Sequence, residues 1–399
     1  MNSGERLRIA VFSDSALPVL NGVSISIDAL TQELRRQGHS VHLYSPRFAG
    51  YQDPDPNTFR FRSLESPISK GYPVAIPPFY RMLRRFREQR YDVIHTHTPY
   101  MLGMVGYRWA ESHDIPIVST YHTLYDRYAH YFRLLPRRYV RYRIAKHTNF
   151  YYNRVDHVIT PTEASLKWLR RHSVTQPVTV IPTGLPPAKM LDRSEVRHRL
   201  GIPPEQRILL YVGRLAREKN LNVLFEAAAR ALHKDSSLRF WLVGDGPYRS
   251  GCIAMARELG IGDRVRFVGF VDRSRVDEYY AAADLFVFAS ITETQGLVIQ
   301  EAMTHGLPAV VVAGGGASAA IEEGATGLLT KNDASDLADH IQLVLGDEML
   351  YARLSDAAAK ASRTNGIPAM TSRVVEVYRQ VISEHQQLPS PFDLAGLRG

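Results

Sequence analysis

Short apolar runs alternate with stretches of helical periodicity along most of the chain. In the first half, residues 8–13 and 92–96 form apolar runs of strand length, and a helical pattern spans about residues 24–37 between them. The second half repeats this rhythm, with strand-like runs at residues 208–212 and 285–289. Strands that alternate with helices in this way predict an α/β fold with doubly wound parallel sheets.

The segment Gly184-Leu-Pro-Pro-Ala188 interrupts this alternation near the middle of the chain. Glycine and proline favour turns and end regular elements, so the segment predicts a hinge between two domains. A chain of 399 residues is long enough for two domains that each have their own core. We therefore expect a first domain at residues 1–186 and a second at residues 187–370.

The composition excludes several classes of protein. Apolar residues make up 45% and charged residues 22% of the chain, as in ordinary globular proteins. The single cysteine, Cys252, excludes an internal disulfide framework and favours a reducing compartment such as the cytoplasm. Residues 1–8 lead into the first strand without the features of a signal peptide, and no apolar run is long enough to span a bilayer. We expect a protein that is soluble or peripheral to a membrane.

Charge is distributed unevenly between the two halves. Residues 1–190 contain 26 Lys and Arg and 14 Asp and Glu, a net charge of +12, whereas residues 191–399 contain 23 and 26, a net charge of −3. The two values add up to the overall charge of +9. A basic half joined to a slightly acidic half predicts that the first domain faces an anionic partner.

Residues 290–303 carry the strongest chemical signal. An apolar strand ends before them, Glu293 lies in the turn that follows, and Gly296 opens a helical pattern that contains Glu301. Eight residues at about 1.5 Å each separate the two carboxylates by roughly 12 Å, which is the reach from the sugar to the ribose of a nucleotide sugar. The N–H groups of a helix N-terminus between them would suit a diphosphate. An amphipathic helix with two solvated acids is the alternative interpretation.

Two further strand-to-turn segments accompany this one. Residues 211–220 present Arg214 and Lys219 where a helix begins, and such cations can neutralise a diphosphate leaving group. Residues 241–247 add a tight glycine turn after another strand. Because ligands bind at the carboxyl edge of parallel sheets, the three segments together predict one ligand site in the second half.

On these residues the sequence resembles the retaining glycosyltransferases of family 4. The pairs Glu293/Glu301 and Arg214/Lys219 match the donor-site motif of that family in order and context, and the resemblance extends to about residue 378. It implies the GT-B architecture, in which two Rossmann-like domains face a cleft and the last part of the chain, about residues 371–399, crosses back to the first domain. It also implies a UDP-sugar donor, with no cofactor and no catalytic metal.

The resemblance implies roles for individual residues. Arg214 and Lys219 would neutralise the leaving diphosphate, and Glu301 would bind the ribose hydroxyls. Glu293 would bind sugar hydroxyls or support oxocarbenium charge, and His122 matches a family histidine near the transferred sugar and the acceptor hydroxyl. The expected catalytic residues are His122, Glu293, Arg214 and Lys219, and the expected donor-binding residues are Gly22, Arg214, Lys219, Val271, Glu293, Thr294, Gln295, Gly296, Leu297 and Glu301.

The first half supplies candidate acceptor residues. The loop after the first strand contains Asn21 and Gly22, for which a plain strand-to-helix turn is the alternative interpretation. His95, His97 and His122 lie near strand ends; His97 is a candidate for lining the acceptor pocket, whereas His95 is expected to be structural. We expect the side chains of His95 and His97 to point to opposite faces of their strand, and no Cys or carboxylate nearby completes a ligand set. No metal site is therefore predicted.

Two basic segments carry the prediction of an anionic membrane partner. Residues 79–87 combine an apolar stripe, formed by Phe79, Met82, Leu83 and Phe86, with the cations Arg81, Arg84, Arg85 and Arg87. This pattern is typical of an interfacial helix, and a helix that packs its stripe on the sheet is the alternative. Residues 133–146 interleave tyrosines with cations that include Arg137, Arg138 and Arg141, which suits an anionic membrane surface or a nucleic acid.

Within family 4, several short segments, among them residues 121–128 and 292–297, look most like the diacylglycerol glycosyltransferases. This resemblance implies transfer of a hexosyl unit, with glucosyl favoured, from a UDP-sugar to 1,2-diacylglycerol by an enzyme that is cytoplasmic and peripheral on the inner face of the cell membrane. A family-4 enzyme with a soluble or polyprenyl-linked acceptor is the closest alternative. A phosphorylase or epimerase of the same fold is more remote, and so is a nucleic-acid-binding protein, because the donor motif argues against a nucleic-acid partner.

Overall fold

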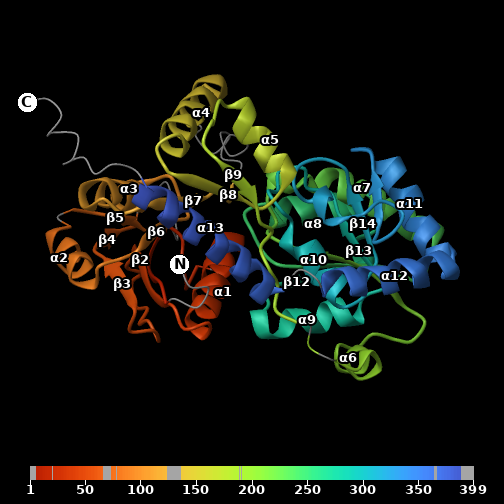
Figure 1. Cartoon of the computed structure of the whole chain (residues 1–399). Coiled ribbons are helices and arrows are strands. Elements are labelled where there is room, and N and C mark those ends of the chain that lie inside the picture. The colour runs from red at the N-terminus through yellow and green to blue at the C-terminus, as the bar shows by residue number, and fades with distance from the viewer. Residues whose placement is uncertain are drawn as a thin grey trace, which may run out of the picture. The chain divides into compact units, whose positions relative to one another are not determined.

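The computed structural model describes residues 6–19, 21–65, 73–77, 79–123, 136–187, 189, 191–363 and 366–387. The chain divides into two compact units, whose elements Figure 1 labels. Unit 1 contains the chain up to Gly184 together with the part from Ile367 onward, and unit 2 runs from Leu185 to Gly366. Each unit is built on its own parallel sheet, so the predicted architecture of two doubly wound sheets is confirmed.

The sheet of unit 1 has the strand order β3-β2-β1-β6-β7-β8-β9 in the described residues. Every neighbouring pair is parallel, as expected for strands joined by helices. Its strands are β1 (Arg8–Phe12), β2 (Ser40–Pro46), β3 (Thr58–Phe61), β6 (Val93–Thr96), β7 (Ile117–Thr120), β8 (His157–Thr160) and β9 (Val178–Val180). A short antiparallel pair consists of β4 (Ser63–Leu64) and β5 (Val74–Ala75).

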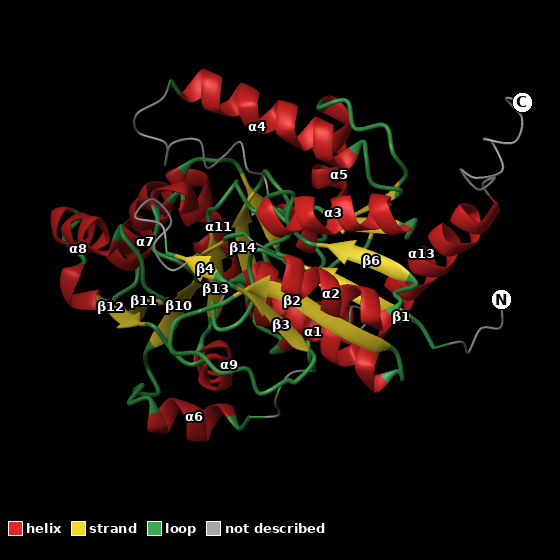
Figure 2. Ribbon diagram, turned by 90° about the vertical axis from the view of Figure 1, so that its left-hand side faces the viewer, coloured by secondary structure: helices red, strands yellow, loops and turns green. Residues whose placement is uncertain are grey.

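Helices cover both faces of this sheet. They are α1 (Gly22–Arg36), α2 (Tyr80–Gln89), α3 (Met101–His113), α4 (Arg137–Tyr152), α5 (Glu163–Arg171) and α13 (Ile367–Gln387). Successive side chains of a strand point to opposite faces, and β1 illustrates this. Ile9 and Val11 share one apolar core with α1 and α13, whereas Ala10 and Phe12 share another with α2, α3, α4 and α5. Within the second layer, α4 lies on the outside of unit 1, beyond α3 (Figure 2).

Local sequence signals explain the ends of α1. The Asn21 side chain accepts a hydrogen bond from the Ser24 N–H at 2.9 Å, and the Asn21 N–H donates to the Ser24 hydroxyl at 3.1 Å. This reciprocal arrangement is a capping box, which satisfies N–H groups that a helix leaves without acceptors. Gly38 follows the last turn with a φ of +93°, a conformation that glycine adopts without steric strain.

The C-terminal helix α13 packs on one face of the first sheet, together with α1. Its residues Val374, Tyr378 and Val381 are buried in the core that also contains Ile27 and Leu30 of α1. Figure 1 shows α13 running across unit 1 beside α1. Helix α13 therefore packs on the first sheet, as the resemblance implied for this part of the chain.

The sheet of unit 2 has the strand order β12-β11-β10-β13-β14-β15 in the described residues. Its strands are β10 (Arg207–Val212), β11 (Leu238–Val243), β12 (Val265–Gly269), β13 (Leu285–Phe288), β14 (Ala309–Val312) and β15 (Leu328–Thr330). Its helices are α6 (Arg193–Arg199), α7 (Leu221–Lys234), α8 (Arg249–Glu258), α9 (Arg273–Ala282), α10 (Leu297–Thr304), α11 (Ala334–Gly346) and α12 (Glu348–Ser362). Almost all the buried apolar residues of these elements belong to one continuous core.

Each sheet has one point at which the order of strands reverses. In unit 1 the chain moves from β1 outward to β2 and β3 and then returns to β6, on the other side of β1. In unit 2 it moves from β10 to β11 and β12 and returns to β13. Loops at the carboxyl ends of the strands that flank such a point run in opposite directions, which is why ligands of open α/β sheets bind there. Residues after β1 and β6, and after β10 and β13, are therefore the first places to look for a site.

Close packing between α3 and the loop after β6 makes Gly103 intolerant of a side chain. A Cβ at Gly103 would lie 1.7 Å from the Thr98 carbonyl oxygen, whereas a Cβ at Gly346, in α11, would meet nothing within 4 Å. Gly103→Ala should lower the free energy of unfolding by at least about 2 kcal/mol, and Gly346→Ala should leave it unchanged or raise it by up to about 1 kcal/mol. Urea unfolding followed by tryptophan fluorescence measures both, and equal stabilities for the two variants would contradict this packing.

Candidate functional site

Glycine turns bring together the backbone segments that follow β10 and β11. Gly213 and Gly244 have φ angles of +153° and +124°, and a Cβ on Gly244 would lie 2.1 Å from the Gly213 carbonyl oxygen. Only a residue without a side chain permits so close an approach. This packing places Arg214 and the 3-10 turn Arg217–Lys219 directly after β10, at the switch point of unit 2.

Lys219 and Glu293 meet at that switch point. The Lys219 ammonium forms an ion pair with Glu293 Oε1, and the Ser290 hydroxyl donates to the same oxygen at 3.0 Å. The Thr292 hydroxyl donates to the Glu218 carbonyl oxygen at 3.2 Å, which ties the loop after β13 to the loop after β10. Lys219 and Glu293 are 74 residues apart in sequence. Folding thus brings a cation and a carboxylate to one place, where a single ligand can contact both.

Glycines also shape the turn into α10. Gly296 precedes the helix with a φ of +70°, and as the N-cap residue it has no side chain that could accept a hydrogen bond from the first turn. The N–H groups of a first helical turn lack intrahelical acceptors and suit an anion such as a diphosphate. Gly316 packs against this turn, since its N–H donates to the Glu293 carbonyl oxygen at 2.7 Å and a Cβ there would lie 1.7 Å from the Thr294 carbonyl oxygen.

Glu301 lies inside α10 and is held by two residues of α9. Arg273 forms an ion pair with one carboxylate oxygen at 2.7 Å, and the Tyr280 hydroxyl donates to the other at 2.8 Å. Glu301 is only 7% exposed, and a buried carboxylate is stable as an anion only when cations and donors surround it. Burial raises the pKa of Tyr280, so its hydroxyl keeps the proton that it donates.

Sequence reasoning missed Arg273 and Tyr280. Their spacing of seven residues places them on one face of α9, and this was the only signal available for them. Nothing in the sequence indicates that this face meets Glu301, because α9 and α10 are separated by the strand β13. The partners of Glu301 are therefore a finding of the structure.

The expected donor residues of unit 2 all follow strands of one sheet edge or lie in α10. Val271 comes two residues after β12 and packs against the core of unit 2. Gln295 is buried in the turn before α10, and its side-chain amide donates to the Gln300 side-chain oxygen at 2.9 Å. Arg214 accepts a hydrogen bond from the Tyr211 hydroxyl through its carbonyl oxygen at 3.1 Å. The structure therefore places these residues on one edge of unit 2.

At the switch point of unit 1, Asp14 organises the loops after β1 and β6. The Thr98 hydroxyl donates to Asp14 Oδ2 at 2.6 Å, and the Leu102 N–H donates to Asp14 Oδ1 at 3.0 Å. Asp14 thus caps α3 from a different loop. Burial raises the pKa of the Asp14 carboxyl, although these hydrogen bonds act in the opposite direction. Sequence reasoning missed this residue, since its partners are more than 80 positions away.

The expected roles of Asn21 and Gly22 fall on the start of α1. Gly22 is the first residue of the helix, and Asn21 is its cap. The Asn21 side-chain amide also donates to the Ser15 hydroxyl at 2.9 Å. The side chain of Asn21 therefore has a structural role at this loop, while the approach of Gly22 to a phosphate stays a prediction.

Three histidines form a row in unit 1. Nδ1 of His97 and Nε2 of His122 share a hydrogen bond of 2.8 Å, and the ring centroids of His95 and His97 are 4.0 Å apart. His95 is hydrogen-bonded through Nδ1 to the Tyr378 hydroxyl at 2.6 Å and through Nε2 to the Thr120 hydroxyl at 2.7 Å, as befits a structural residue. The expectation that His95 and His97 point to opposite faces was wrong, because residues two positions apart along a strand lie on the same face.

This row lines a small cavity of unit 1. The cavity measures about 20 Å³, which is room for one water-sized group and too little for a sugar. Besides the three histidines, it is lined by Ser26 and Thr183, whose hydroxyls lie 3.3 Å apart, and by apolar residues that include Met370. Burial lowers the pKa of His95 to about 3, that of His122 to about 4 and that of His97 well below its usual range. All three imidazoles are therefore neutral at pH 7.

Histidines and carboxylates do not combine into a metal site in the described ranges. Within them, no group of three or more His, Cys, Asp or Glu is arranged to hold a metal ion. The short contact between His97 and His122 is a hydrogen bond between ring nitrogens, which leaves no room for a metal between them.

The apolar stripe of α2 packs inward. Phe86 is fully buried, Phe79 packs edge-on against Phe61 at 5.2 Å, and Met82 and Leu83 contact the same core. The interpretation of this stripe, Phe79 included, as a membrane-inserting face is therefore corrected: it faces the sheet. The cations Arg81, Arg84, Arg85 and Arg87 and the aromatic Tyr80 remain exposed.

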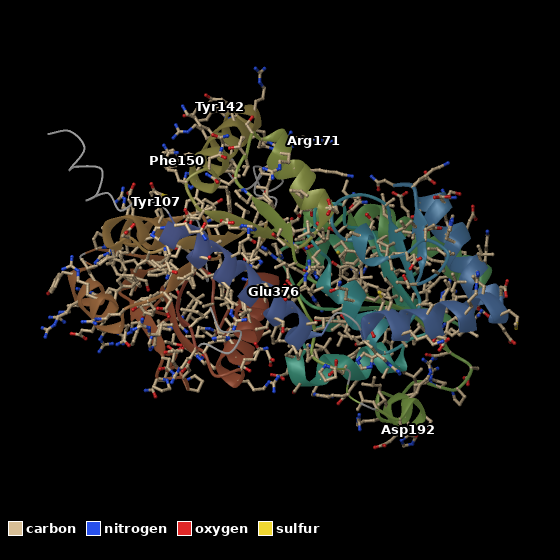
Figure 3. The ribbon with its side chains drawn as sticks, in the orientation of Figure 1. Tyr107, Tyr142, Phe150, Arg171, Asp192 and Glu376 are labelled. Atoms are coloured by element: carbon tan, nitrogen blue, oxygen red, sulfur yellow. The ribbon has the colours of Figure 1, made fainter. Side chains whose placement is uncertain are left out.

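Helix α4 presents a different surface, with cations and aromatic rings exposed together. Tyr142 is 60% and Phe150 41% exposed, and Figure 3 labels both on α4. The exposed cations of this helix are Arg137, Arg138, Arg141, Arg143 and Lys146. Residues 133–135 of the predicted basic segment lie outside the described residues. None of the helices in the described ranges has the length and apolar composition that crossing a bilayer requires.

Two family models match the chain. Residues 20–189 match Glycosyltransferase Family 4, and residues 192–361 match Glycosyl transferases group 1. The boundary between the two matches falls close to the boundary between the two units.

Curated relatives of the chain differ in the compound that their names state. It is 33% identical over 320 residues to an alpha-monoglucosyldiacylglycerol synthase of Streptococcus pneumoniae, covering 76% of this chain and 70% of the relative. A synthase of the same name from Acholeplasma laidlawii is 28% identical over 395 residues, 96% of this chain and 99% of the relative. A D-inositol 3-phosphate glycosyltransferase of Nocardia farcinica is 30% identical over 389 residues, 87% of this chain and 83% of the relative.

Solved structures of low sequence identity share the fold. The Anabaena HepE protein in complex with UDP-glucose matches with a TM-score of 0.73 and 20% identity, over 94% of this chain and 100% of that one. At this identity the similarity shows the fold and no more.

Buried neutral histidines should make the stability of the protein depend on pH. The pKa of His95 falls from about 6.5 in the unfolded chain to about 3 in the folded one, so stability is complete above pH 6.5 and is lost as the pH falls toward 3. Between pH 7.5 and pH 4.5, His95 alone should lower the free energy of unfolding by roughly 2–3 kcal/mol. Urea midpoints at the two pH values measure this loss.

The control for this prediction is His95→Gln, which retains a polar side chain but does not titrate. The difference in unfolding free energy between the two pH values should shrink in the variant by about the same 2–3 kcal/mol. Other buried histidines with lowered pKa values, such as His39 and His157, contribute equally to both proteins and cancel. An identical pH dependence in variant and wild type would show that His95 is not the titrating group.

Proposed function

Because the chain belongs to the glycosyltransferases of family 4 and has the GT-B fold, we propose that it transfers a hexosyl unit from a UDP-sugar to the hydroxyl of 1,2-diacylglycerol. Glucosyl is the proposed unit, and the anomeric configuration is retained. The observation that carries the proposal is the meeting of Lys219 with Glu293 at the switch point of unit 2, beside a helix that holds Glu301. These are the residues that the donor motif of the family requires.

On the donor side, each group of this edge has a separate role. The carboxylate of Glu301, fixed by Arg273 and Tyr280, accepts hydrogen bonds from the ribose hydroxyls. The N–H groups at the start of α10 face the diphosphate. Glu293 binds the hydroxyls of the sugar, and its ion pair with Lys219 keeps both charges stable before the donor arrives.

Charge development on the leaving group is the step that the protein stabilises. The bond from the anomeric carbon to the diphosphate oxygen breaks, the acceptor oxygen bonds to the same face of that carbon, and the acceptor proton passes to the departing diphosphate. Negative charge grows on the diphosphate in the transition state, where Arg214 and Lys219 offset it. Two fixed cations perform the task that a divalent metal performs in other folds, so the proposal includes no catalytic metal.

A lipid acceptor is supported by two observations. Relatives at 33% and 28% identity are named alpha-monoglucosyldiacylglycerol synthases. In addition, α4 exposes cations with aromatic rings, and Tyr and Arg at one surface suit the interface of an anionic membrane. We propose that unit 1 lies on the inner face of the cell membrane through this surface.

A soluble acceptor is the second candidate. A relative at 30% identity is named for D-inositol 3-phosphate, and an exposed basic surface also suits a phosphorylated acceptor. A polyprenyl-linked acceptor would use the same donor residues. The two candidates differ in whether activity depends on a lipid surface.

One experiment separates these acceptors. The purified protein is incubated with UDP-glucose, UDP-galactose or UDP-glucuronic acid and with vesicles that contain diacylglycerol, or with D-inositol 3-phosphate in solution, each with and without EDTA. The proposal expects a glucosyl lipid that forms equally well in EDTA, and Glu293→Gln serves as the inactive control. Product only from the soluble acceptor would replace the lipid proposal, and activity that EDTA abolishes and Mg²⁺ restores would overturn the metal-free mechanism.

Glu301→Ala should weaken UDP binding more than it alters the choice of sugar. Loss of charge-assisted hydrogen bonds to the ribose should lower the affinity by about 1.5–3 kcal/mol, or roughly 10- to 150-fold. Calorimetric titration with UDP measures the change. Glu226→Ala, which removes an exposed carboxylate from α7 of the same unit, should bind UDP as the wild type does. UDP affinity that does not change in Glu301→Ala would remove this residue from the ribose site.

Reversing the charge of α4 should release the protein from anionic vesicles. Each cation near such a surface contributes about 1 kcal/mol, screened over about 10 Å in 0.1 M salt, so the binding should also fall as salt rises. Co-sedimentation with phosphatidylglycerol vesicles compares three variants. The α4 variant changes Arg137, Arg138, Arg141 and Arg143 to Glu, the α2 variant changes Arg81, Arg84, Arg85 and Arg87 to Glu, and the control changes the exposed unit 2 residues Arg230, Arg257, Arg353 and Arg363 to Glu.

The α4 variant should lose the most binding, because its helix adds exposed aromatic rings to its charges. The α2 variant should lose the electrostatic part alone, since its apolar stripe faces the core. UDP affinity should be the same in all three. If the control loses as much binding as the α4 variant, net charge and not this surface determines docking.

A further inference from the structure

The hydrogen bond between His97 and His122 constrains both imidazoles. It joins Nδ1 of His97 to Nε2 of His122 at 2.8 Å, and both rings are neutral at pH 7 because burial lowers their pKa values. A hydrogen bond between two neutral rings contains one proton, which belongs to one nitrogen or to the other. The ring that lacks this proton must carry its own proton on its other nitrogen.

Only two arrangements satisfy this rule, and in both the two histidines have the same tautomer. If Nδ1 of His97 is the donor, then Nε2 of His122 is bare and His122 carries its proton on Nδ1. If Nε2 of His122 is the donor, then Nδ1 of His97 is bare and His97 carries its proton on Nε2. The tautomer of His97 therefore decides whether Nδ1 of His122 is a hydrogen-bond donor or a base.

The surroundings of His97 favour the first arrangement. Nε2 of His97 has no hydrogen-bond partner in the described residues, and the side chain is only 1% exposed. A buried N–H group left without an acceptor is rarer in proteins than a buried acceptor left without a donor. The proton of His97 is therefore best placed on Nδ1, in the bond to His122.

The ring of His97 also packs against the ring of His95. The two ring centroids lie 4.0 Å apart. Both nitrogens of His95 are held, by the hydroxyl of Tyr378 on α13 and by that of Thr120 at the end of β7. The His97 ring thus packs against a neighbour that is itself held on both sides, while its Nδ1 is hydrogen-bonded to His122.

We propose that His97 is a positioning residue that holds His122 in the tautomer with its proton on Nδ1, so that His122 offers a hydrogen-bond donor and not a base to a substrate oxygen. The inference rests on the proposed function, in which His122 lies near the transferred sugar and the acceptor hydroxyl. It agrees with a mechanism in which the acceptor proton goes to the departing diphosphate. His122 then orients an oxygen by donating to it, and no proton is transferred to the protein.

Nuclear magnetic resonance of the ¹⁵N-histidine-labelled full chain tests this directly, because the ¹⁵N shift of each ring nitrogen reports whether it carries a proton. Signals are assigned from His97→Asn and His122→Asn. In the wild type, His97 and His122 should both be protonated on Nδ1. In His97→Leu, which removes the donor, His122 should lose this preference and populate the Nε2–H form. In His97→Asp, the carboxylate can accept a hydrogen bond but cannot donate one. The Nε2–H form of His122 should therefore predominate in this variant.

Activity provides the second measurement. His97→Asn can still donate from its amide at about the position of Nδ1 and should retain kcat within about threefold of wild type. His97→Leu should lower kcat about tenfold, the effect of one lost or misdirected hydrogen bond, with little change in KM for the donor. A merely structural role for His97 would not be rescued by Asn and would not move the tautomer of His122.

The outcomes separate this proposal from the proposed function. A wild-type His122 protonated on Nε2, or a His122 signal that is the same in His97→Leu and wild type, overturns the proposal even if diacylglycerol is glycosylated. If the urea midpoint shows that His97→Leu does not fold, the ¹⁵N shifts of His122 in the Asn and Asp variants decide between the two tautomers. The spectra are recorded without substrate. If they show the predicted tautomers but the protein does not glycosylate diacylglycerol, only the proposed acceptor is contradicted.

Discussion

The switch point of each parallel sheet is the constraint on which the rest of this structure depends. Where strand order reverses, the loops at the carboxyl ends of two adjacent strands run apart, and side chains there are not covered by a crossover helix. In unit 2 this point lies between β10 and β13 and brings Lys219 to Glu293. In unit 1 it lies between β1 and β6 and brings Asp14 to the start of α3. The candidate functional residues therefore lie where the topology leaves backbone and side chains accessible.

Polar groups buried at these edges are stable because neighbouring elements satisfy them. Glu301 is held by Arg273 and Tyr280, and the histidine row is anchored by Tyr378 and Thr120. Burying such groups without partners would cost several kcal/mol each, so the partners are as necessary as the groups that meet a substrate. The same condition pre-orients each group, since a side chain with fixed partners does not need to rearrange when a ligand binds.

In unit 1, the pattern of residues alone does not show which helix directs its apolar side chains into the core and which helix exposes them. Both α2 and α4 are rich in cations and aromatic residues, yet α2 directs its apolar stripe at the sheet, whereas α4 leaves Tyr142 and Phe150 exposed. An amphipathic pattern reports that a helix has an apolar face, and it is the same whether a core or a membrane covers that face. The difference between the two helices decides which of them can contribute apolar contact to a lipid surface.

The sequence by itself determined the fold class and the order of the donor motif. Strand and helix periodicities are local, and Glu293, Gly296 and Glu301 lie within one strand-to-helix segment, so their spacing could be interpreted without knowledge of the rest of the chain. Only the tertiary structure decided which groups are partners. The contact of His95 with Tyr378 spans 283 positions, and those of Asp14 and Lys219 span 84 and 74. Such pairs depend on the packing of whole elements, and no local pattern records them, because the free energy that brings them together comes from the apolar cores around them.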